Sequence, residues 1–231
     1  SVAEVTGDIA LALDQLASGA GPVSPRWEVR EVAAVRQALW RRLVEESTSR
    51  DLAPHQVVLE AQEAFGDEAL VTIDVGSHKL LVNQLWRAAA PNRVFQSNGL
   101  STMGFGFPAA VAISLALNRQ RVLCMTGDGG FLMVLGDLAV AVSRRLPVTT
   151  VVFCDGSLNR ILLKQEDKGY PPVGTLLDNP DFARVAEAFG AAGFHARTRA
   201  ELRQALSAAR ELQGPAVIAA HVDPAEYKVQ F

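Results

Sequence analysis

Two aspartates in the middle of the chain each lie in a glycine-containing turn that follows an apolar run. Asp128 lies in the GDGG turn at 127–130, and Asp155 begins the DGS turn at 155–157. Glycines let backbone N–H groups approach an anion, and the N-terminus of a following helix adds positive potential. A carboxylate there would repel a bare phosphate. We therefore expect a metal between them, and Mg²⁺ is the expected ion because it pairs carboxylates with phosphate oxygens.

The segments around these turns predict how the two aspartates are positioned. Residues 121–126 and 148–154 are apolar runs of strand length, and residues 131–143 carry apolar side chains at helical spacing before Pro147. In a parallel α/β sheet, the loops after both strands emerge at the carboxyl edge, where ligands bind. The sequence therefore predicts a diphosphate held through Mg²⁺ at that edge.

This arrangement resembles the signature of thiamine diphosphate (ThDP) enzymes, and in particular the acetolactate synthase-like group. A lone GDG would be an ordinary turn, but here both strands, the helix and the second loop accompany it. The resemblance implies that Asp128 and Asp155 bind the metal through their side chains and Ser157 through its main-chain carbonyl. The family has Asn where this chain has Asp155, so the substitution keeps an oxygen ligand and adds a charge beside the diphosphate.

A second segment, SNGLSTMGFGFPAA at 97–110, resembles another signature of the same group. The resemblance implies that the Ser101 carbonyl accepts a hydrogen bond from the cofactor's 4'-amino group and that Met103 supports the cofactor's bent shape. The alternative for Met103 is a core residue that fills a gap. The turn at 76–78 would contact the diphosphate, although a lone His such as His78 is often structural. The expected cofactor-binding residues are Gly76, Ser77, His78, Ser101, Met103, Gly127, Asp128, Gly129, Gly130, Asp155 and Ser157.

The chain departs from the family pattern at two points besides Asp155. Acetohydroxyacid synthases have a Trp after the metal loop where this chain has Lys164, which puts a substrate selection like theirs in doubt. The family's cofactor-activating Glu belongs to a separate pyrimidine-binding domain, which this chain lacks, so no catalytic residue is expected here. The resemblance implies a parent enzyme that decarboxylates a small 2-oxo acid, while the chain alone is expected to be inactive.

Two alternatives stay open beside this interpretation. One is a decarboxylase of the benzoylformate or phenylpyruvate type, which this part of the protein does not distinguish from a carboligating enzyme. The other is a non-catalytic domain that serves assembly; the presence of both Asp128 and Asp155 argues against it.

Composition excludes several other classes of function. The 231 residues carry a formal net charge of −3, so no basic footprint for nucleic acid is present. No apolar run reaches the roughly 18 residues that a membrane span requires. The first residues have no basic segment before an apolar core, so we expect no secretory signal and a cytoplasmic location. Cys124 and Cys154, in predicted strands, are expected to be buried thiols.

Strands alternating with helices predict a doubly wound, mostly parallel sheet with helices on both faces. We expect residues 1–20 to be the tail of a preceding central domain, with a strand at 2–5 and a helix to residue 17. Residues 21–25 form a linker, and 26–231 form the diphosphate-binding domain. The predicted helices 108–117 and 131–142 are apolar almost all round, which predicts a homodimer in addition to a pyrimidine-binding partner domain.

Overall fold

The computed structural model of the chain describes residues 6–21, 24, 26–44 and 52–230. The chain divides into two compact units, Ser1–Leu39 and Trp40–Phe231. The smaller unit contains α1 (Ile9–Gly19), which begins where the Asp8 carboxylate accepts the Leu11 N–H at 3.0 Å. The helix α2 (Val29–Val44) begins in this unit and ends in the larger one. The strand predicted at 2–5 lies outside the described residues.

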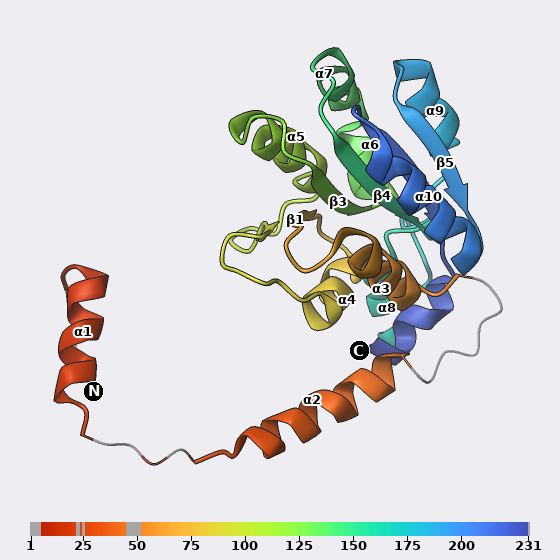
Figure 1. Cartoon of the computed structure of the whole chain (residues 1–231). Helices are drawn as coiled ribbons and strands as arrows, with labels where there is room; N and C mark the ends of the chain where they lie inside the picture. Colours follow the sequence, from red (N-terminus) through yellow and green to blue (C-terminus); the bar gives the residue numbers. More distant parts are fainter. Residues whose placement is uncertain (1–5, 22–23, 25, 45–51, 231) are drawn as a thin grey trace. The chain divides into compact units, whose positions relative to one another are not determined.

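The larger unit is built on a six-stranded sheet in which every strand pair is parallel (Figure 1). Its order is β2-β1-β3-β4-β6-β5, which confirms the predicted doubly wound α/β fold. The strands are β1 (Leu70–Ile73), β2 (Val94–Gln96), β3 (Val122–Gly127), β4 (Val148–Cys154), β5 (Ala192–Ala196) and β6 (Ala216–His221).

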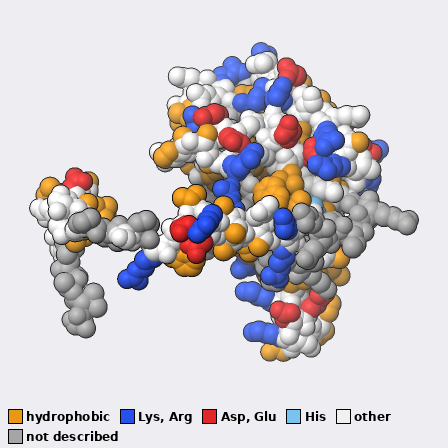
Figure 2. Space-filling model, turned by 60° about the horizontal axis from the view of Figure 1, so that its bottom comes forward, with side chains coloured by type: hydrophobic (Ala, Val, Ile, Leu, Met, Phe, Trp, Pro, Cys, Tyr) orange, Lys and Arg blue, Asp and Glu red, His pale blue; other side chains and the backbone are white. Residues whose placement is uncertain are grey.

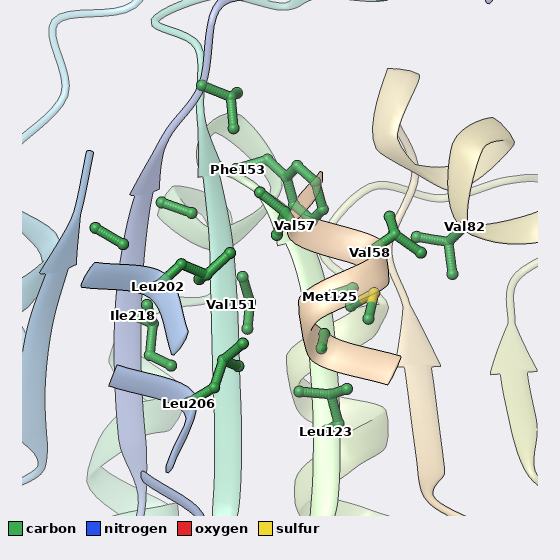
Figure 3. Close-up of a cluster of buried hydrophobic side chains, with 14 of the residues drawn as sticks. Val57, Val58, Val82, Leu123, Met125, Val151, Phe153, Leu202, Leu206 and Ile218 are labelled. Carbon is green, nitrogen blue, oxygen red and sulfur yellow. The ribbon is translucent and has the colours of Figure 1, made fainter. Parts of the chain in front are cut away.

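Alternation along the strands divides the core into two layers, one on each face of the sheet. In β3, Leu123 and Met125 face one layer, while Val122 and Cys124 face the other. The first layer packs against α3 (Pro54–Phe65), α4 (Ser77–Leu85) and α10 (Arg199–Glu211). Figure 3 shows Val57 and Val58 of α3 and Leu202 and Leu206 of α10 over this face.

The second layer lies under α5 (Gly106–Ala116), α6 (Asp128–Met133), α7 (Leu138–Ser143) and α9 (Phe182–Phe189). Because both faces are covered, the central strands are mostly apolar and do not alternate regularly with polar residues, and the threonines that they contain are buried. Both cysteines are free thiols; Cys124 is buried, as the sequence predicts, whereas Cys154 is only partly buried.

Three predicted boundaries are wrong. The GDGG turn is not a loop before a helix, because α6 begins at Asp128 itself. The single helix predicted at 131–143 is interrupted by the 3-10 turn η1 (Leu135–Asp137), which contains the weak helix former Gly136. The sequence predicts no helix directly after the second loop, where α8 (Asn159–Asp167) begins. The chain closes with the 3-10 segment η2 (Pro224–Gln230).

The surface carries mixed charge. Lys and Arg side chains are interspersed with Asp and Glu over the visible face of the larger unit (Figure 2). Within the described ranges, no helix is both long and apolar enough to cross a membrane.

Candidate functional site

All eleven residues expected from the sequence meet at one cavity of about 210 Å³. Its walls come from the segments that follow β1, β3 and β4, together with the loop before α5. The carboxyl ends of adjacent parallel strands therefore assemble the site, as the fold predicts. The cavity is lined by Gly76, Ser77, His78, Ser101, Met103, Gly127, Asp128, Gly129, Gly130, Asp155 and Ser157, and by five further residues, Val75, Leu158, Asn159, Arg160 and Ile161.

Asp128 is held in place by three hydrogen bonds. Its Oδ1 accepts the Gly129 N–H at 2.7 Å. Its Oδ2 accepts the Gly156 N–H at 2.8 Å and the Asn179 side-chain amide at 2.7 Å. Burial raises the pKa of this carboxyl, and these donors oppose the shift. The hydrogen bonds connect the loops after β3 and β4 through one carboxylate.

Asp155 lies beside Asp128 and has a less favourable environment. Its Oδ1 accepts both the N–H and the hydroxyl of Ser157, each at 2.9 Å, and its Oδ2 accepts no hydrogen bond from any described residue. Burial and the neighbouring charge of Asp128 raise the pKa of Asp155 to about 7. Two carboxylates sharing a poorly solvated site favour a bound cation, which would stabilise both charges.

The chemistry of this donor set fits a hard divalent cation. The described residues contain no group of three or more His, Cys, Asp or Glu side chains arranged to hold a metal. Two carboxylates and a main-chain carbonyl would therefore leave several positions for oxygen atoms of a ligand or of water. Mg²⁺ typically takes one or two carboxylates together with phosphate oxygens and water.

The turn after β1 is part of a helix rather than a loop. Ser77 and His78 form the first turn of α4, and the Ser77 hydroxyl donates to Asn159 Oδ1 at 2.7 Å. His78 stacks on Phe153 with ring centroids 5.2 Å apart, and its buried Nε2 has no hydrogen-bond partner. Burial lowers the pKa of His78 to about 3, so the ring is neutral at pH 7.

The His78 ring also explains two of the glycines. A Cβ at Gly76 would lie 2.7 Å from His78 Cε1, and a Cβ at Gly127 would lie 3.2 Å from the same atom. Any larger residue at Gly76 would displace the ring. These glycines therefore serve packing inside the site, in addition to any approach of a ligand to their backbone.

Ser101 and Met103 are placed on the other side of the cavity. Ser101 has a left-handed backbone, with φ 51°, a conformation that is uncommon for residues other than glycine and that occurs at functional sites. Met103 is partly buried and belongs to neither hydrophobic cluster of the described residues, which disfavours the alternative of a core residue. Its Cε lies 3.5 Å from where a Cβ of Gly129 would be.

Asp74 is a functional residue that sequence reasoning missed. It follows β1 and is fully buried, and its carboxylate accepts the N–H of Gly104 at 3.0 Å and that of Gly106 at 3.3 Å. The Thr126 hydroxyl donates to it at 3.2 Å. Asp74 thereby fixes the loop that carries Ser101 and Met103 against β3. Its place as the single acidic residue of the mostly apolar run ALVTIDV, next to the end, was the available signal.

Two asparagines were also missed. Asn159, which is nearly buried, begins α8 and joins it to Ser77. Asn179 reaches Asp128 from a return segment that runs beside the second loop: the Leu158 N–H donates to the Thr175 carbonyl at 2.7 Å, and the Leu177 N–H donates to the Gly156 carbonyl at 2.9 Å. Neither Asn lies in a local motif, and only the folded chain brings them to the site.

Comparison with known proteins agrees with this geometry. Residues 74–220 match the family model described as the thiamine pyrophosphate enzyme C-terminal TPP-binding domain. YdaP of Bacillus subtilis (strain 168), named as a thiamine pyrophosphate-containing protein, is 35% identical over 184 residues, covering 79% of this chain and 32% of that protein. Acetolactate synthase from the same organism is 31% identical over 170 residues, covering 74% and 30%.

A solved structure shares the fold. Benzoylformate decarboxylase from Polynucleobacter necessarius superposes with a TM-score of 0.71 at 24% identity, covering 77% of this chain and 34% of that one. At this identity the likeness shows the fold alone. The chain spans about a third of the length of the curated relatives it matches.

The fold and the site together define an α/β ligand-binding domain with an acid pair at the carboxyl edge of its sheet. The match to the family model covers more than half of the chain. The chain belongs to the thiamine pyrophosphate enzyme family, as an acetolactate synthase-like C-terminal TPP-binding domain. The resemblance that the two glycine-containing segments indicate is confirmed.

Proposed function

We propose that this domain holds ThDP through Mg²⁺, with Asp128, Asp155 and the main-chain carbonyl of Ser157 as the metal's protein ligands. The observation that carries the proposal is the pair of neighbouring carboxylates in the cavity, of which Asp128 is buried and Asp155 partly buried, and whose pKa values are both raised. The N–H groups of the following loops already hold Asp128 in place, so the metal would bind a positioned carboxylate.

On the opposite wall, the Ser101 carbonyl and the Met103 side chain are proposed to hold the aminopyrimidine end of the cofactor. The left-handed backbone at Ser101 sets the direction of its carbonyl, and Asp74 fixes the rest of this loop. Gly76, Ser77 and His78 would contact the diphosphate side. When bound, ThDP supplies the chemistry that stabilises a carbanion, while these residues bind and orient it.

The parent protein is proposed to decarboxylate a small 2-oxo acid and to release or transfer the product. Its cofactor-activating Glu would come from a pyrimidine-binding domain, so the isolated chain is expected to be inactive. Residues 1–20 are proposed to end a preceding domain, and the cytoplasmic location stays a prediction. Assays of the full-length parent for carboligation against aldehyde release would separate an acetolactate synthase-like enzyme from a simple decarboxylase.

The metal assignment is tested by Asp128→Ala in the full-length parent. The change removes an anionic ligand from the metal, so Mg²⁺-dependent binding of ThDP is expected to become undetectable by calorimetric titration. Asp137→Ala is the matched control, because Asp137 is exposed in η1 outside the cavity. Unchanged affinity in the Asp128 variant would contradict the metal site. Failure of the unaltered parent to bind ThDP would instead support a non-catalytic assembly role.

A further inference from the structure

One cavity-lining residue, Arg160, has no part in the proposed cofactor site. Among the described residues that line the cavity, the charged side chains are Asp128, Asp155 and Arg160, since His78 is neutral. Arg160 is the second residue of α8, directly after Asn159, which Ser77 anchors at 2.7 Å. The backbone at the start of α8 is therefore held beside the start of α4, while the Arg160 side chain is exposed.

The position of Arg160 is unfavourable for a cation in the chain itself. No carboxylate of the described residues lies within ion-pair distance of its guanidinium. A positive charge in the first turn of a helix opposes the helix dipole. Lys164 lies one turn further along α8, and like charges at this spacing repel each other.

A third cation adds to the positive potential at this rim. The ammonium of Lys79 donates to the Ser97 carbonyl at 2.6 Å, at the start of the loop that carries Ser101. Burial, followed by the charge of Arg160, lowers the pKa of Lys79. The positive charges of Lys79 and Arg160 are thus close enough to repel each other. An anion bound at Arg160 would offset this repulsion, the repulsion from Lys164 and the unfavourable effect of the helix dipole.

The remaining lining near Arg160 suits a short carbon chain. Met103, Leu158 and Ile161 are apolar, and all three line the same cavity. A ligand with an apolar middle and an anionic end would match both features. The acid pair and a divalent cation together carry no net charge, so the diphosphate is the competing anion for Arg160, and ThDP titration of an Arg160 variant distinguishes the two.

The carboxylate that a decarboxylation removes is also a poor match for Arg160. Its negative charge disperses as the C–C bond breaks, so a fixed cation beside it would stabilise the substrate more than the transition state. A carboxylate that does not leave has no such penalty. Resting on the proposed function, we propose that Arg160 binds the distal carboxylate of a dicarboxylic 2-oxo acid.

Kinetics of the full-length parent with ThDP and Mg²⁺ test this specificity. 2-Oxoglutarate and 2-oxopentanoate have equal chain length and differ only in the distal carboxylate. Arg160→Met should lower kcat/KM for 2-oxoglutarate by about 10- to 100-fold, as expected for loss of a charge-assisted hydrogen bond. It should change kcat/KM for 2-oxopentanoate less than about 3-fold, and Arg160→Lys should restore part of the loss. Arg41→Met, at an exposed arginine of α2 outside the cavity, is the control.

A binding measurement separates this inference from the proposed function. Glutarate and pentanoate carry no oxo group and are not decarboxylated, so their calorimetric titration into the same protein reports the anion contact without turnover. We expect glutarate to bind more tightly and the preference to disappear in Arg160→Met. If neither 2-oxo acid is turned over while this preference holds, the carboxylate contact at Arg160 is supported, and its assignment to a 2-oxo acid substrate fails together with the proposed function.

Three results would overturn the inference. The first is an unaltered parent that has no preference for glutarate over pentanoate. The second is an equal loss of kcat/KM for both 2-oxo acids in Arg160→Met, which would indicate a structural effect. The third is weakened ThDP binding in that variant, which would assign the guanidinium to the diphosphate.

Discussion

At the scale of single residues, the Asp155 side chain can ionise, whereas an Asn at this position could not. Its carboxyl is held beside Asp128 in a poorly solvated place, and its pKa is raised to about 7. In the unfolded chain an Asp ionises near pH 3.9. The folded, metal-free chain therefore retains a proton that the unfolded chain loses, and its stability falls as pH rises from about 4 to about 7.

Asp155→Asn is expected to remove this pH dependence. At pH 8 without metal, the variant should be more stable than the unaltered chain by on the order of a few kcal/mol. At pH 4 the two should differ little, because Asp155 is then protonated in the folded state. Urea unfolding at both pH values measures this. An equal effect at pH 4 and pH 8 would show that the charge of Asp155 is not the cause.

A substitution at Asp74 is expected to act indirectly, because Asp74 holds the loop before α5 in place without lining the cavity. Asp74→Asn keeps the shape but removes the charge that accepts the Gly104 and Gly106 N–H groups. We expect a loss of about 1.5–3 kcal/mol in the free energy of unfolding and weaker ThDP binding by the full-length parent. Asp137→Asn, at an exposed site, should be neutral. Unaltered ThDP affinity in Asp74→Asn would mean that the loop is positioned by other contacts.

The residues that the sequence does and does not predict differ in how local their partners are. Asp128 and Asp155 lie in short motifs, so their types and order suffice to indicate a metal loop. The partners of Asp74 lie up to 52 positions away, and Asn179 meets Asp128 across 51 positions. No local sequence pattern indicates hydrogen bonds between residues this far apart in the chain.

At the scale of elements, the central strands β3 and β4 were predictable because their apolar runs are buried on both faces. The helix α8 was not predicted. Its N-cap Leu158 makes no side-chain capping bond, and the sequence NRILLKQED lacks a strong start signal. Tertiary contacts hold it instead: Asn159 bonds to Ser77, and the return segment at 175–177 pairs with the loop before it.

The start of α5 provides a prediction at this scale. A Cβ at Gly106 would lie 2.9 Å from the Asp74 Cβ and 3.0 Å from its backbone nitrogen. Gly106→Ala should therefore displace α5 from β1 and lower the free energy of unfolding by about 1–3 kcal/mol. Gly136→Ala is the matched control, because its Cβ would meet nothing within 4 Å. Equal unfolding midpoints for the two variants in urea would show that the contact with Asp74 is relieved without cost.

At the scale of the whole molecule, the chain spans about a third of the length of the curated relatives that it matches. On the proposed function, a pyrimidine-binding domain would complete the cofactor site. The fold was predictable because the sheet and both of its layers are encoded within the chain. A surface that packs against another domain cannot be predicted from the sequence in this way, because its apolar residues resemble those of a helix in the core.

Three helices, α5, α6 and α7, leave part of their apolar surface uncovered. In α5, Leu115 is 47% exposed and Leu117, at its C-terminus, is 41% exposed. Met133 at the end of α6 is 63% exposed, and Val140 in α7 is 43% exposed. The opposite faces of these helices pack into the core, so they are apolar on more than one side, as the sequence predicts.

Exposed apolar surface on neighbouring elements typically marks an interaction site, and a second copy of the chain could cover it. We therefore expect the 231-residue chain to dimerise at micromolar concentration in sedimentation velocity. Leu115→Glu combined with Met133→Glu should shift it to monomer, whereas Val173→Glu, at an exposed residue of the loop before α9, should not. A chain that is monomeric and binds no hydrophobic dye would show that these helices need no cover, and would contradict the prediction.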